Sequence, residues 1–347
     1  MNILMISGSY PPEVCGVGDY TAQLVESLRR MDVEVRTLEG VKWNLGSLAK
    51  ILEATGHHRY DIIHIQYPTV GYGSSLIPQL LSLKVPAIVT LHEFSQARLP
   101  RRLATIPFLL FARRLLFTSA YELAGIQRML PGIGRKSEVI PIGTNVRPSP
   151  IPKPRRFDEV IYFGLIAPRK GIEQVIEFSA AASQTDPGIR VRVIGRVPDA
   201  FRDYARQVMA LAADLPIRWT LDKSESEVAD ILAEASLAYL PFPDGASDRR
   251  GSLKAALSSG VVCISTDGKA VPDELRKHLV FASDGKDALE KARSLLTDRS
   301  SLESLSAESR AYSESFDWEK IARKHLEVYA RFAEQEKPHS RWSGHIG

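Results

Sequence analysis

Proline occupies every second position near the middle of this chain, in the segment Arg147-Pro148-Ser149-Pro150-Ile151-Pro152-Lys153-Pro154. Proline fixes φ and has no backbone N–H, so this segment cannot lie inside a sheet and favours an extended, semi-rigid spacer. Each side of the spacer is long enough, within 347 residues, to bury a core of its own. We therefore expect one domain over residues 1–148 and a second domain that begins at residue 149.

Short apolar runs alternate with helix-like segments on both sides of the spacer. Most of these runs lack polar alternation, which is typical of strands buried on both faces of a parallel sheet. The expected strands are residues 3–6, 33–38, 61–65, 87–91 and 137–141, and then 160–163, 191–195, 237–241 and 261–265. The pattern predicts two doubly wound α/β domains, whose ligands bind beyond the carboxyl ends of the strands.

Several other classes of protein are disfavoured. The two cysteines, Cys15 and Cys263, are too few for a disulfide framework. No basic signal peptide opens the chain, and no apolar run approaches the ~18 residues of a membrane span. We expect a soluble, cytoplasmic protein. Walker, G-x-G-x-x-G, D-x-D, paired-cysteine and H-E-x-x-H motifs are missing, which argues against a P-loop site, a nicotinamide enzyme and a metal centre.

Positive charge is concentrated in the first half, where residues 1–148 hold 16 Lys and Arg against 11 Asp and Glu. Around the apolar run 106–112 the only acids are Glu93 and Glu122, and the arginines are Arg98, Arg101, Arg102, Arg113, Arg114, Arg128 and Arg135. Such a segment fits a helix lying on an anionic bilayer, or an ordinary buried helix with snorkelling arginines. The sequence leaves both open. Aromatic residues do not interleave with the basic ones, so nucleic-acid binding is not expected.

Three loops at expected strand ends could hold an anion. Gly16, Val17 and Gly18 precede a helix whose first N–H groups face outward. Arg169 and Lys170 stand at another helix start, where cations oppose the helix dipole and make sense beside a phosphate. The third loop carries Asp244, Ser247, Asp248, Arg249, Arg250, Gly251, Ser252 and Leu253. A plain turn, a solvated charge pair and a helix cap with Arg249 paired to Asp248 are the structural alternatives.

A histidine follows another expected strand. His92 comes directly after the strand that ends at Leu91, and His64 and Gln66 stand at the end of a third. A histidine at such a place serves either a structural or a catalytic role.

Taken in order, these segments resemble the retaining glycosyltransferases of family 4, which have the GT-B fold. The resemblance covers nearly the whole chain. Its motifs are Pro11-Pro12 with Gly16-Val17-Gly18, Val139-Ile140-Pro141-Ile142-Gly143-Thr144, Phe163-Gly164 with Arg169-Lys170-Gly171, Gly260-Val261-Val262-Cys263-Ile264-Ser265-Thr266, and Phe316-Asp317-Trp318-Glu319-Lys320-Ile321-Ala322. It implies two facing Rossmann-like domains, an acceptor domain over 1–148 and a nucleotide-sugar domain over 149–324. A helix over about 325–347 would cross back to the first domain.

By that similarity the enzyme needs no metal. It moves a sugar from a UDP- or GDP-sugar to a glycan or lipid-linked acceptor, in polysaccharide or cell-envelope glycan biosynthesis. Peripheral contact with the inner face of an anionic membrane would suit a lipid-linked acceptor. Arg169 and Lys170 would neutralise the departing diphosphate, and His92 would lie near the donor sugar. The phosphate side would include the loop of Gly16, Val17 and Gly18, Gly164 and the residues of the third loop. The acceptor side would include Tyr10, Asp19, Gln66 and Glu93.

The sequence departs from the family in one place. The usual Glu-x7-Glu pair, counted back from Gly260, falls on Ser247 and Ala255, or begins at Asp248 if the loop is one residue shorter. We expect Asp248 or Ser247 to meet the donor sugar instead. Two alternatives follow from this loss, a catalytically inactive binding subunit and a sugar-nucleotide epimerase. The retained Arg169, Lys170 and His92 favour a transferase.

Overall fold

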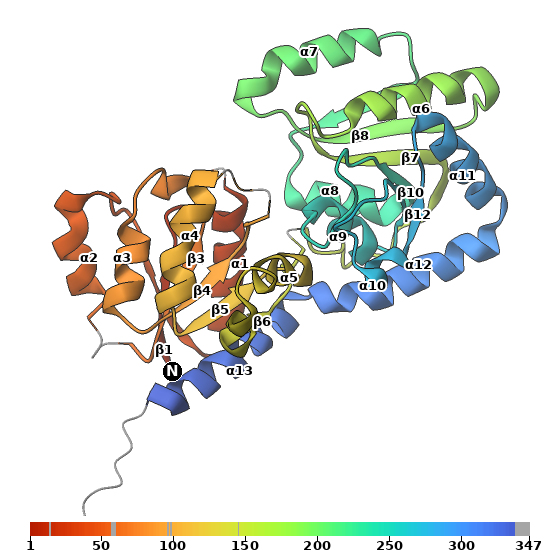
Figure 1. Ribbon diagram of the computed structural model, residues 1–347. Helices are drawn as coiled ribbons and strands as arrows, with labels where there is room; N and C mark the ends of the chain where they lie inside the picture. Colours follow the sequence, from red (N-terminus) through yellow and green to blue (C-terminus); the bar gives the residue numbers. More distant parts are fainter. Residues whose placement is uncertain (14, 57–59, 96, 98, 145, 337–347) are drawn as a thin grey trace, which may run out of the picture. The chain divides into compact units, whose positions relative to one another are not determined.

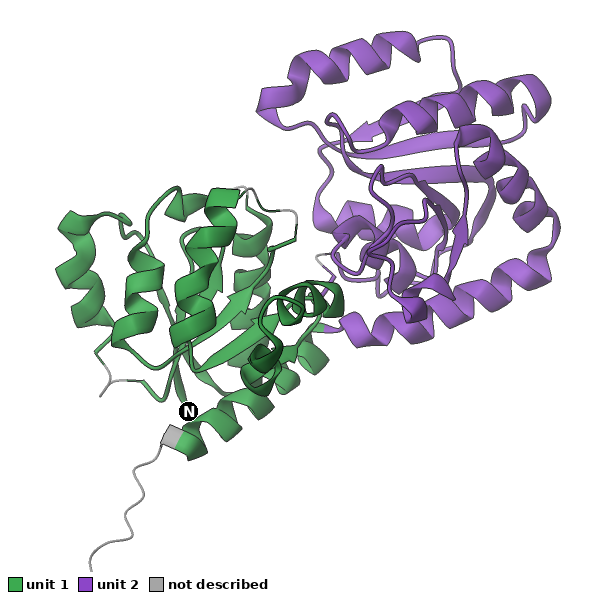
Figure 2. Cartoon of the chain, viewed as in Figure 1, with its two compact units in different colours: residues 1–142, 318–347 green, residues 143–317 purple. Residues whose placement is uncertain are grey.

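The computed structural model describes residues 1–336 except 14, 57–59, 96, 98 and 145. The chain divides into two compact units, Met1–Ile142 with Trp318–Gly347, and Gly143–Asp317 (Figure 2). The sequence placed these boundaries at 148 and 324. The proline segment belongs to the second unit, where Ser149 Oγ donates to Asp230 Oδ1 over 2.7 Å. Residues 337–347, the end of the expected crossing helix, and Arg98 lie outside the described residues.

The first unit is built on a parallel sheet (Figure 1). Within the described residues the sheet has six strands, in the order β2 (Glu34–Leu38), β1 (Asn2–Ile6), β3 (Ile62–Tyr67), β4 (Ala87–Leu91), β5 (Arg114–Phe117) and β6 (Ser137–Val139). Its helices are α1 (Gly16–Arg29), α2 (Leu48–Ala54), α3 (Ile77–Lys84), α4 (Leu99–Phe111), α5 (Ala120–Gln127) and α13 (Trp318–Glu336).

Strand β1 shows why this sheet needs helices on both faces. Successive side chains of a strand point to opposite faces. Ile3 and Met5 pack in one apolar cluster with residues of α1 and α13. Leu4 and Ile6 pack in another cluster with residues of α2 to α5. Both faces are therefore covered, which explains why this strand is apolar at consecutive positions.

Helix α13 returns to the first unit, as the sequence predicts, although it begins at Trp318 and not near 325. Its buried residues Ile321, Val328 and Phe332 join the cluster that covers Ile3 and Met5. About 175 residues of the second unit therefore separate this helix in sequence from the sheet that it covers.

The second unit repeats the architecture. Its described residues form a six-stranded parallel sheet in the order β9 (Ile217–Leu221), β8 (Arg190–Arg196), β7 (Arg156–Leu165), β10 (Ala235–Leu240), β11 (Val262–Ser265) and β12 (Leu279–Phe281). The helices are α6 (Ile172–Thr185), α7 (Arg202–Leu211), α8 (Glu225–Glu234), α9 (Gly251–Ser258), α10 (Asp273–Arg276), α11 (Gly285–Thr297) and α12 (Arg299–Ser313). In chain order, β8 and β9 are added outward from β7 on one side, and β11 and β12 are added outward from β10 on the other side. This is the strand order of a Rossmann fold. The predicted α/β fold class is confirmed.

Three strands were not expected from the sequence: β5, β9 and β12. The apolar residues of β5 follow directly on the apolar, basic segment of α4, and β12 has only three residues. Strand β9 is an edge strand with exposed Arg218 and half-buried Trp219. Among the described helices, none is long and apolar enough to cross a bilayer.

Candidate functional site

In the second unit the strand order reverses between β7 and β10. Ligands of open α/β sheets bind at the carboxyl ends of the strands at such a point. The loop after β7 contains Arg169 and Lys170, and the loop after β10 contains Asp244 and Arg250. The fold therefore brings together two of the three loops that the sequence singled out.

The loop after β7 has a constrained backbone. Gly171 has φ +83°, and a Cβ there would collide with the carbonyl oxygen of Pro241 at the end of β10. Glycine is thus required where the two loops meet. Arg169 has φ +62°, a left-handed conformation that costs an arginine of the order of 1 kcal/mol. The buried Tyr162 hydroxyl donates to the carbonyl oxygens of Leu165 (3.2 Å) and Lys170 (3.0 Å), and so ties this loop to its strand.

Cations gather where the two loops meet. Burial lowers the pKa of Lys170, and the charges of Arg250 and Arg169 lower it further, whereas Asp244 opposes them. Arg250 forms an ion pair with Asp244 and lies over the Phe242 ring, 4.7 Å from its centroid. Its buried Nε has no hydrogen-bond partner among the described atoms. An anion held here would relieve the repulsion and supply an acceptor for Nε.

Two helices begin at this place. The N-cap residue of α6 is Gly171 and that of α9 is Arg250, and neither helix start is capped by a side chain. The first N–H groups of a helix carry partial positive charge and bind phosphate readily. The helix starts and the cations therefore favour the same ligand, a phosphate or diphosphate.

The other residues predicted for the donor side divide by exposure. Asp248, Arg249, Gly251 and Ser252 are half-buried at the start of α9. Ser247 is buried, and the Leu253 side chain lies in the hydrophobic core, so only the backbone of Leu253 can face a ligand. A Cβ at Gly164 would lie 2.8 Å from the Tyr162 hydroxyl, so the packing of this loop accounts for that glycine.

Sequence reasoning missed Lys254, one turn into α9. Its side chain is buried, with Nζ 4.4 Å from the centroid of the Phe316 ring. Burial lowers the pKa of Lys254 to about 7, and the Asp248 carboxylate opposes this shift. The signal was present in the sequence, because Lys254 is the one charged residue in the otherwise apolar run Leu253-Lys254-Ala255-Ala256-Leu257.

In the first unit the order reverses between β1 and β3, and the loop after β1 leads into α1. The sequence placed Gly16 and Gly18 before this helix, but both lie in its first turn, and the two glycines differ. A Cβ at Gly18 would lie 3.0 Å from the Ser9 carbonyl oxygen, whereas a Cβ at Gly16 would meet nothing within 4 Å. Packing accounts for Gly18. Gly16 is exposed and leaves open space, as expected of a position that a ligand approaches.

His92 and Gln66 lie together at the ends of β4 and β3. His92 Nε2 is 2.8 Å from Gln66 Oε1, and the His92 ring packs edge-on against Tyr20 with centroids 4.6 Å apart. Burial lowers the pKa of His92 to about 3, with a smaller effect from His325. His92 is therefore neutral near pH 7. Because the carbonyl oxygen of Gln66 only accepts, Nε2 carries the proton and Nδ1 keeps its lone pair.

Two further histidines lie behind this pair. Gln66 Nε2 is 3.2 Å from His64 Nε2, and His64 Nδ1 is 2.6 Å from the Tyr329 hydroxyl of α13. His325 Nδ1 donates to the Ile321 carbonyl oxygen over 2.9 Å, and its Nε2 lies 3.2 Å from the Tyr20 hydroxyl. Burial lowers the pKa of His325 to about 4 and holds the pKa of His64 well below its usual value.

The remaining acceptor-side predictions are more scattered. Tyr10 lines a separate hollow of about 400 Å³ with residues of α1 and β2. Asp19 is half-buried in the first turn of α1. Glu93 is half-buried directly after His92, in a loop that the buried Glu122 holds by accepting the N–H groups of Phe94 (3.1 Å) and Ser95 (2.8 Å). No motif in the sequence singles out Glu122, which stands there only as one of two acids among seven arginines.

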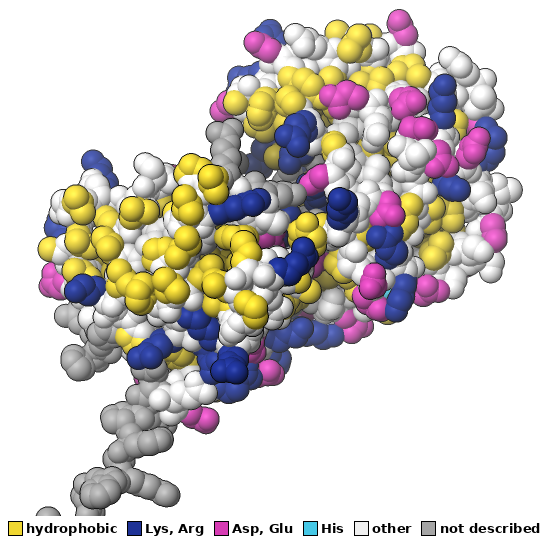
Figure 3. All heavy atoms as spheres, viewed as in Figure 1, with side chains coloured by type: hydrophobic (Ala, Val, Ile, Leu, Met, Phe, Trp, Pro, Cys, Tyr) yellow, Lys and Arg dark blue, Asp and Glu magenta, His cyan; other side chains and the backbone are white. Residues whose placement is uncertain are grey.

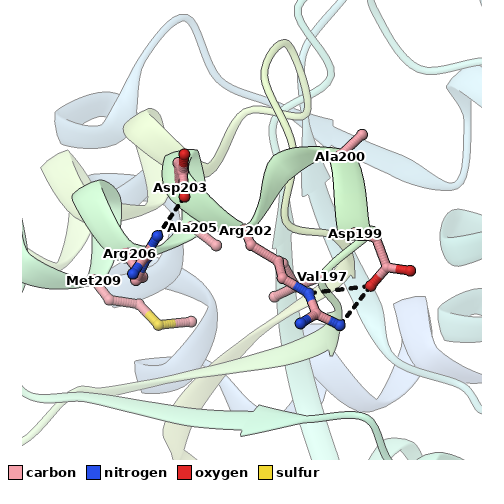
Figure 4. A pocket seen from close by; sticks show the side chains of 8 residues that line it. All are labelled: Val197, Asp199, Ala200, Arg202, Asp203, Ala205, Arg206 and Met209. Atoms are coloured by element: carbon pink, nitrogen blue, oxygen red, sulfur yellow. Dashed lines mark hydrogen bonds and ion pairs between the residues drawn. The ribbon is translucent and has the colours of Figure 1, made fainter.

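Another hollow lies at the start of α7, in the second unit (Figure 4). It measures about 580 Å³ and none of its eight lining residues belongs to the predicted site. Arg202 and Arg206, which line it, pair with Asp199 and Asp203 in the same wall. Their charge is thus largely balanced inside the hollow, which makes it a weaker anion site than the β7 and β10 loops. No group of three or more His, Cys, Asp or Glu placed to hold a metal ion occurs in the described part of the chain.

Comparison with known proteins supports the reading of the fold. No protein-family model matches the chain. The uncharacterised glycosyltransferase YqgM of Bacillus subtilis (strain 168) is 23% identical over 290 residues, which are 76% of this chain and 80% of that protein.

Solved glycosyltransferase structures superpose on nearly the whole chain. A sucrose-phosphate synthase from Thermosynechococcus elongatus matches with a TM-score of 0.70 and 18% identity, over 96% of this chain and 100% of that one. Anabaena Alr3699/HepE, solved with UDP and glucose, matches with a TM-score of 0.67 and 14% identity, over 95% and 100%. Starch Synthase IV from Arabidopsis thaliana, whose catalytic domain was solved with ADP and acarbose, gives 0.64 and 14%, over 96% and 99%. The chain therefore has the GT-B fold of these glycosyltransferases, with two Rossmann-like α/β units.

Proposed function

We propose that this chain is a retaining glycosyltransferase that moves a sugar from a nucleotide-diphosphate sugar to a hydroxyl of a glycan or lipid-linked acceptor. The curated relative and the solved structures support glycosyl transfer. The sequence resemblance supports retention. The observation that carries the proposal is the gathering of Arg169, Lys170 and Arg250 at the starts of α6 and α9.

These residues suit a reaction whose leaving group is a diphosphate. The acceptor oxygen bonds to the anomeric carbon while the bond from that carbon to the diphosphate oxygen breaks. Retention follows if the acceptor attacks on the face that the leaving group vacates, and the departing phosphate then takes the hydroxyl proton. Negative charge grows on the diphosphate, where a guanidinium, an ammonium and two helix starts stabilise it. In this proposal the cations do the work of a metal ion.

The first unit holds the acceptor in this proposal, and His92 contacts the donor sugar. Because its pKa is far below 7, His92 acts as a neutral hydrogen-bonding group. A peripheral position at the inner face of a membrane, in polysaccharide or cell-envelope glycan synthesis, would give this unit access to a lipid-linked acceptor.

A thermal-shift screen tests the donor site. We expect one of UDP, GDP and ADP, or one of their sugars, to raise the Tm without metal, because a ligand that binds only the folded state stabilises it by about 2.7 kcal/mol at 100 times its Kd. An equal shift with Mg²⁺ and with EDTA supports a metal-free site. No shift with any nucleotide contradicts the donor site.

The nucleotide sugar found in that screen is then incubated with lipid and glycan acceptors, and the product is examined by NMR. We expect the anomeric configuration of the donor to be kept. An inverted product contradicts retention. Nucleotide binding with no product would identify a binding subunit, and an isomerised nucleotide sugar formed without acceptor would identify an epimerase.

A further inference from the structure

Two neighbouring helices of the first unit carry apolar side chains on their outer faces. Helices α3 and α4 pack against each other. The exposed apolar residues are Leu76, which precedes α3, Leu80 and Leu83 of α3, and Leu99, Leu103, Ile106, Leu110 and Phe111 of α4. Together they make what we call the α3–α4 face.

Helix α4 is apolar on two sides. Phe108 and Leu109 are buried and belong to the core of the unit. Leu99, Leu103, Ile106 and Leu110 recur at the three- and four-residue spacing of one helix face, and Leu103 and Leu110 are 55% and 58% exposed. A surface helix is normally polar on the face that turns away from the core. Contiguous exposed apolar side chains of this kind mark an interaction site.

The charge around this face has one sign. Residues 62–121 contain a single acidic residue, Glu93, against Lys84, Arg98, Arg101, Arg102, Arg113 and Arg114. Lys84, Arg101 and Arg113 are exposed. Figure 3 shows apolar side chains spread over α3 and α4 with Lys and Arg side chains among and around them. A partner must therefore accept apolar side chains and cations over the same area.

We propose that the α3–α4 face docks on an anionic lipid bilayer. A bilayer surface takes leucine side chains into the boundary between headgroups and acyl chains, and its anionic headgroups attract Lys and Arg. A second copy of the chain fits less well, because the same face on both partners would set cations against cations. The α3–α4 face is thus the surface through which the first unit would take the peripheral membrane position proposed above. The inference rests on that part of the proposed function and does not depend on the donor site.

Flotation of the full chain with lipid vesicles tests the proposal. One set of vesicles is phosphatidylcholine alone, and the other contains phosphatidylcholine and phosphatidylglycerol at 7:3. We expect flotation with the anionic vesicles and much less with the neutral ones, and we expect 0.5 M NaCl to weaken it. Equal flotation with both sets overturns the electrostatic part, and no flotation overturns the proposal.

Matched variants locate the contact. Leu103→Gln with Leu110→Gln should weaken binding to the anionic vesicles about tenfold or more, because two leucines leave the lipid. Arg101→Gln with Arg113→Gln should also weaken it. Leu211→Gln, which changes an exposed leucine of α7, and Arg202→Gln with Arg206→Gln are the controls and should bind as the wild type does.

Two further measurements keep these results unambiguous. All the substituted side chains are exposed, so we expect each variant to keep the Tm of the wild type. An unchanged Tm then shows that a loss of flotation reflects a lost contact with lipid and not unfolding. Sedimentation equilibrium tests the second copy. A dimer in solution that Leu103→Gln dissociates overturns docking on lipid and assigns the face to self-association.

Discussion

His92 Nε2 lies 2.8 Å from Gln66 Oε1, and this hydrogen bond is the outer end of a chain that reaches α13. Gln66 Nε2 contacts His64 Nε2, and His64 Nδ1 contacts the Tyr329 hydroxyl at 2.6 Å. A chain of hydrogen bonds inside a protein restricts the orientation of each side chain that takes part in it. The last helix of the chain therefore helps to orient a histidine at the carboxyl-terminal edge of the first sheet.

Gln66 should act through His92. Gln66→Met removes the acceptor for Nε2 at similar volume, so the imidazole loses its orientation. We expect kcat for glycosyl transfer to fall about 10- to 100-fold, with the KM for the nucleotide sugar near that of the wild type. The control is Gln79→Met, which changes another buried glutamine, bonded to the Ala104 carbonyl oxygen over 3.0 Å. Equal losses of kcat in both variants contradict a positioning role.

His325 and His92, whose pKa values in the folded chain lie far below the usual value, should make the first unit sensitive to acid. The pKa of His325 is about 4 and that of His92 about 3 in the folded chain, against about 6.5 when unfolded. The unfolded state therefore binds more protons below pH 6.5, and stability falls as the pH falls from there towards the folded values. Each histidine contributes about 1.4 kcal/mol per pH unit.

Urea unfolding at pH 7.5, 6.5 and 5.5 measures this effect. His325→Gln lacks one of the two titrating histidines, so the free energy of unfolding of this variant should depend less steeply on pH than that of the wild type. Plotted against pH, the free energies of unfolding of the variant and the wild type should approach each other as the pH falls. A constant difference between them contradicts a neutral, buried His325.

The sequence predicted the two sheets because their central strands are apolar at consecutive positions, as in β1 and β10, and it predicted the loops because glycines and charges follow those strands. It could not place what depends on tertiary contacts. The pairing of His64 with Tyr329 joins residues 265 positions apart. The burial of Lys254 depends on Phe316, which no local pattern connects with α9.

The charge of Arg169 should favour binding of a phosphate, while its backbone conformation lowers the stability of the second unit. Its φ of +62° suits glycine better than arginine. Arg169→Gly should therefore raise the Tm slightly, while the affinity for a nucleoside diphosphate falls about 10- to 100-fold because a charge-assisted contact is lost. Arg202→Gly in α7 is the control and should leave this affinity unchanged. Melting curves measure the Tm of each variant, and calorimetric titration measures its affinity for the nucleoside diphosphate. Full affinity in Arg169→Gly rules out a phosphate contact.

Lys254 should make the stability of the second unit depend on pH above neutrality. Its pKa of about 7 lies below the usual 10.5, so the unfolded state binds more protons between these values and stability rises with pH across that interval. Lys254→Met removes this titrating group and keeps an apolar side chain of similar length. The rise in stability from pH 7 to 10 should be smaller in this variant. An equal rise in Lys254→Met and in the wild type contradicts a lowered pKa of Lys254 in the folded chain.

Substitutions at Gly16 and Gly18 should distinguish an effect on ligand binding from an effect on packing. Gly18→Ala places a Cβ 3.0 Å from the Ser9 carbonyl oxygen, tighter than ordinary contact, so the Tm should fall. Gly16→Ala meets no protein atom within 4 Å, and alanine suits a helix better than glycine, so the Tm should stay the same or rise. If a donor phosphate approaches the backbone at Gly16, the added methyl group occupies its place, and turnover falls in a variant that is fully folded. Melting curves and transfer rates of both variants decide the matter, because full activity in Gly16→Ala means that no ligand comes close to this residue.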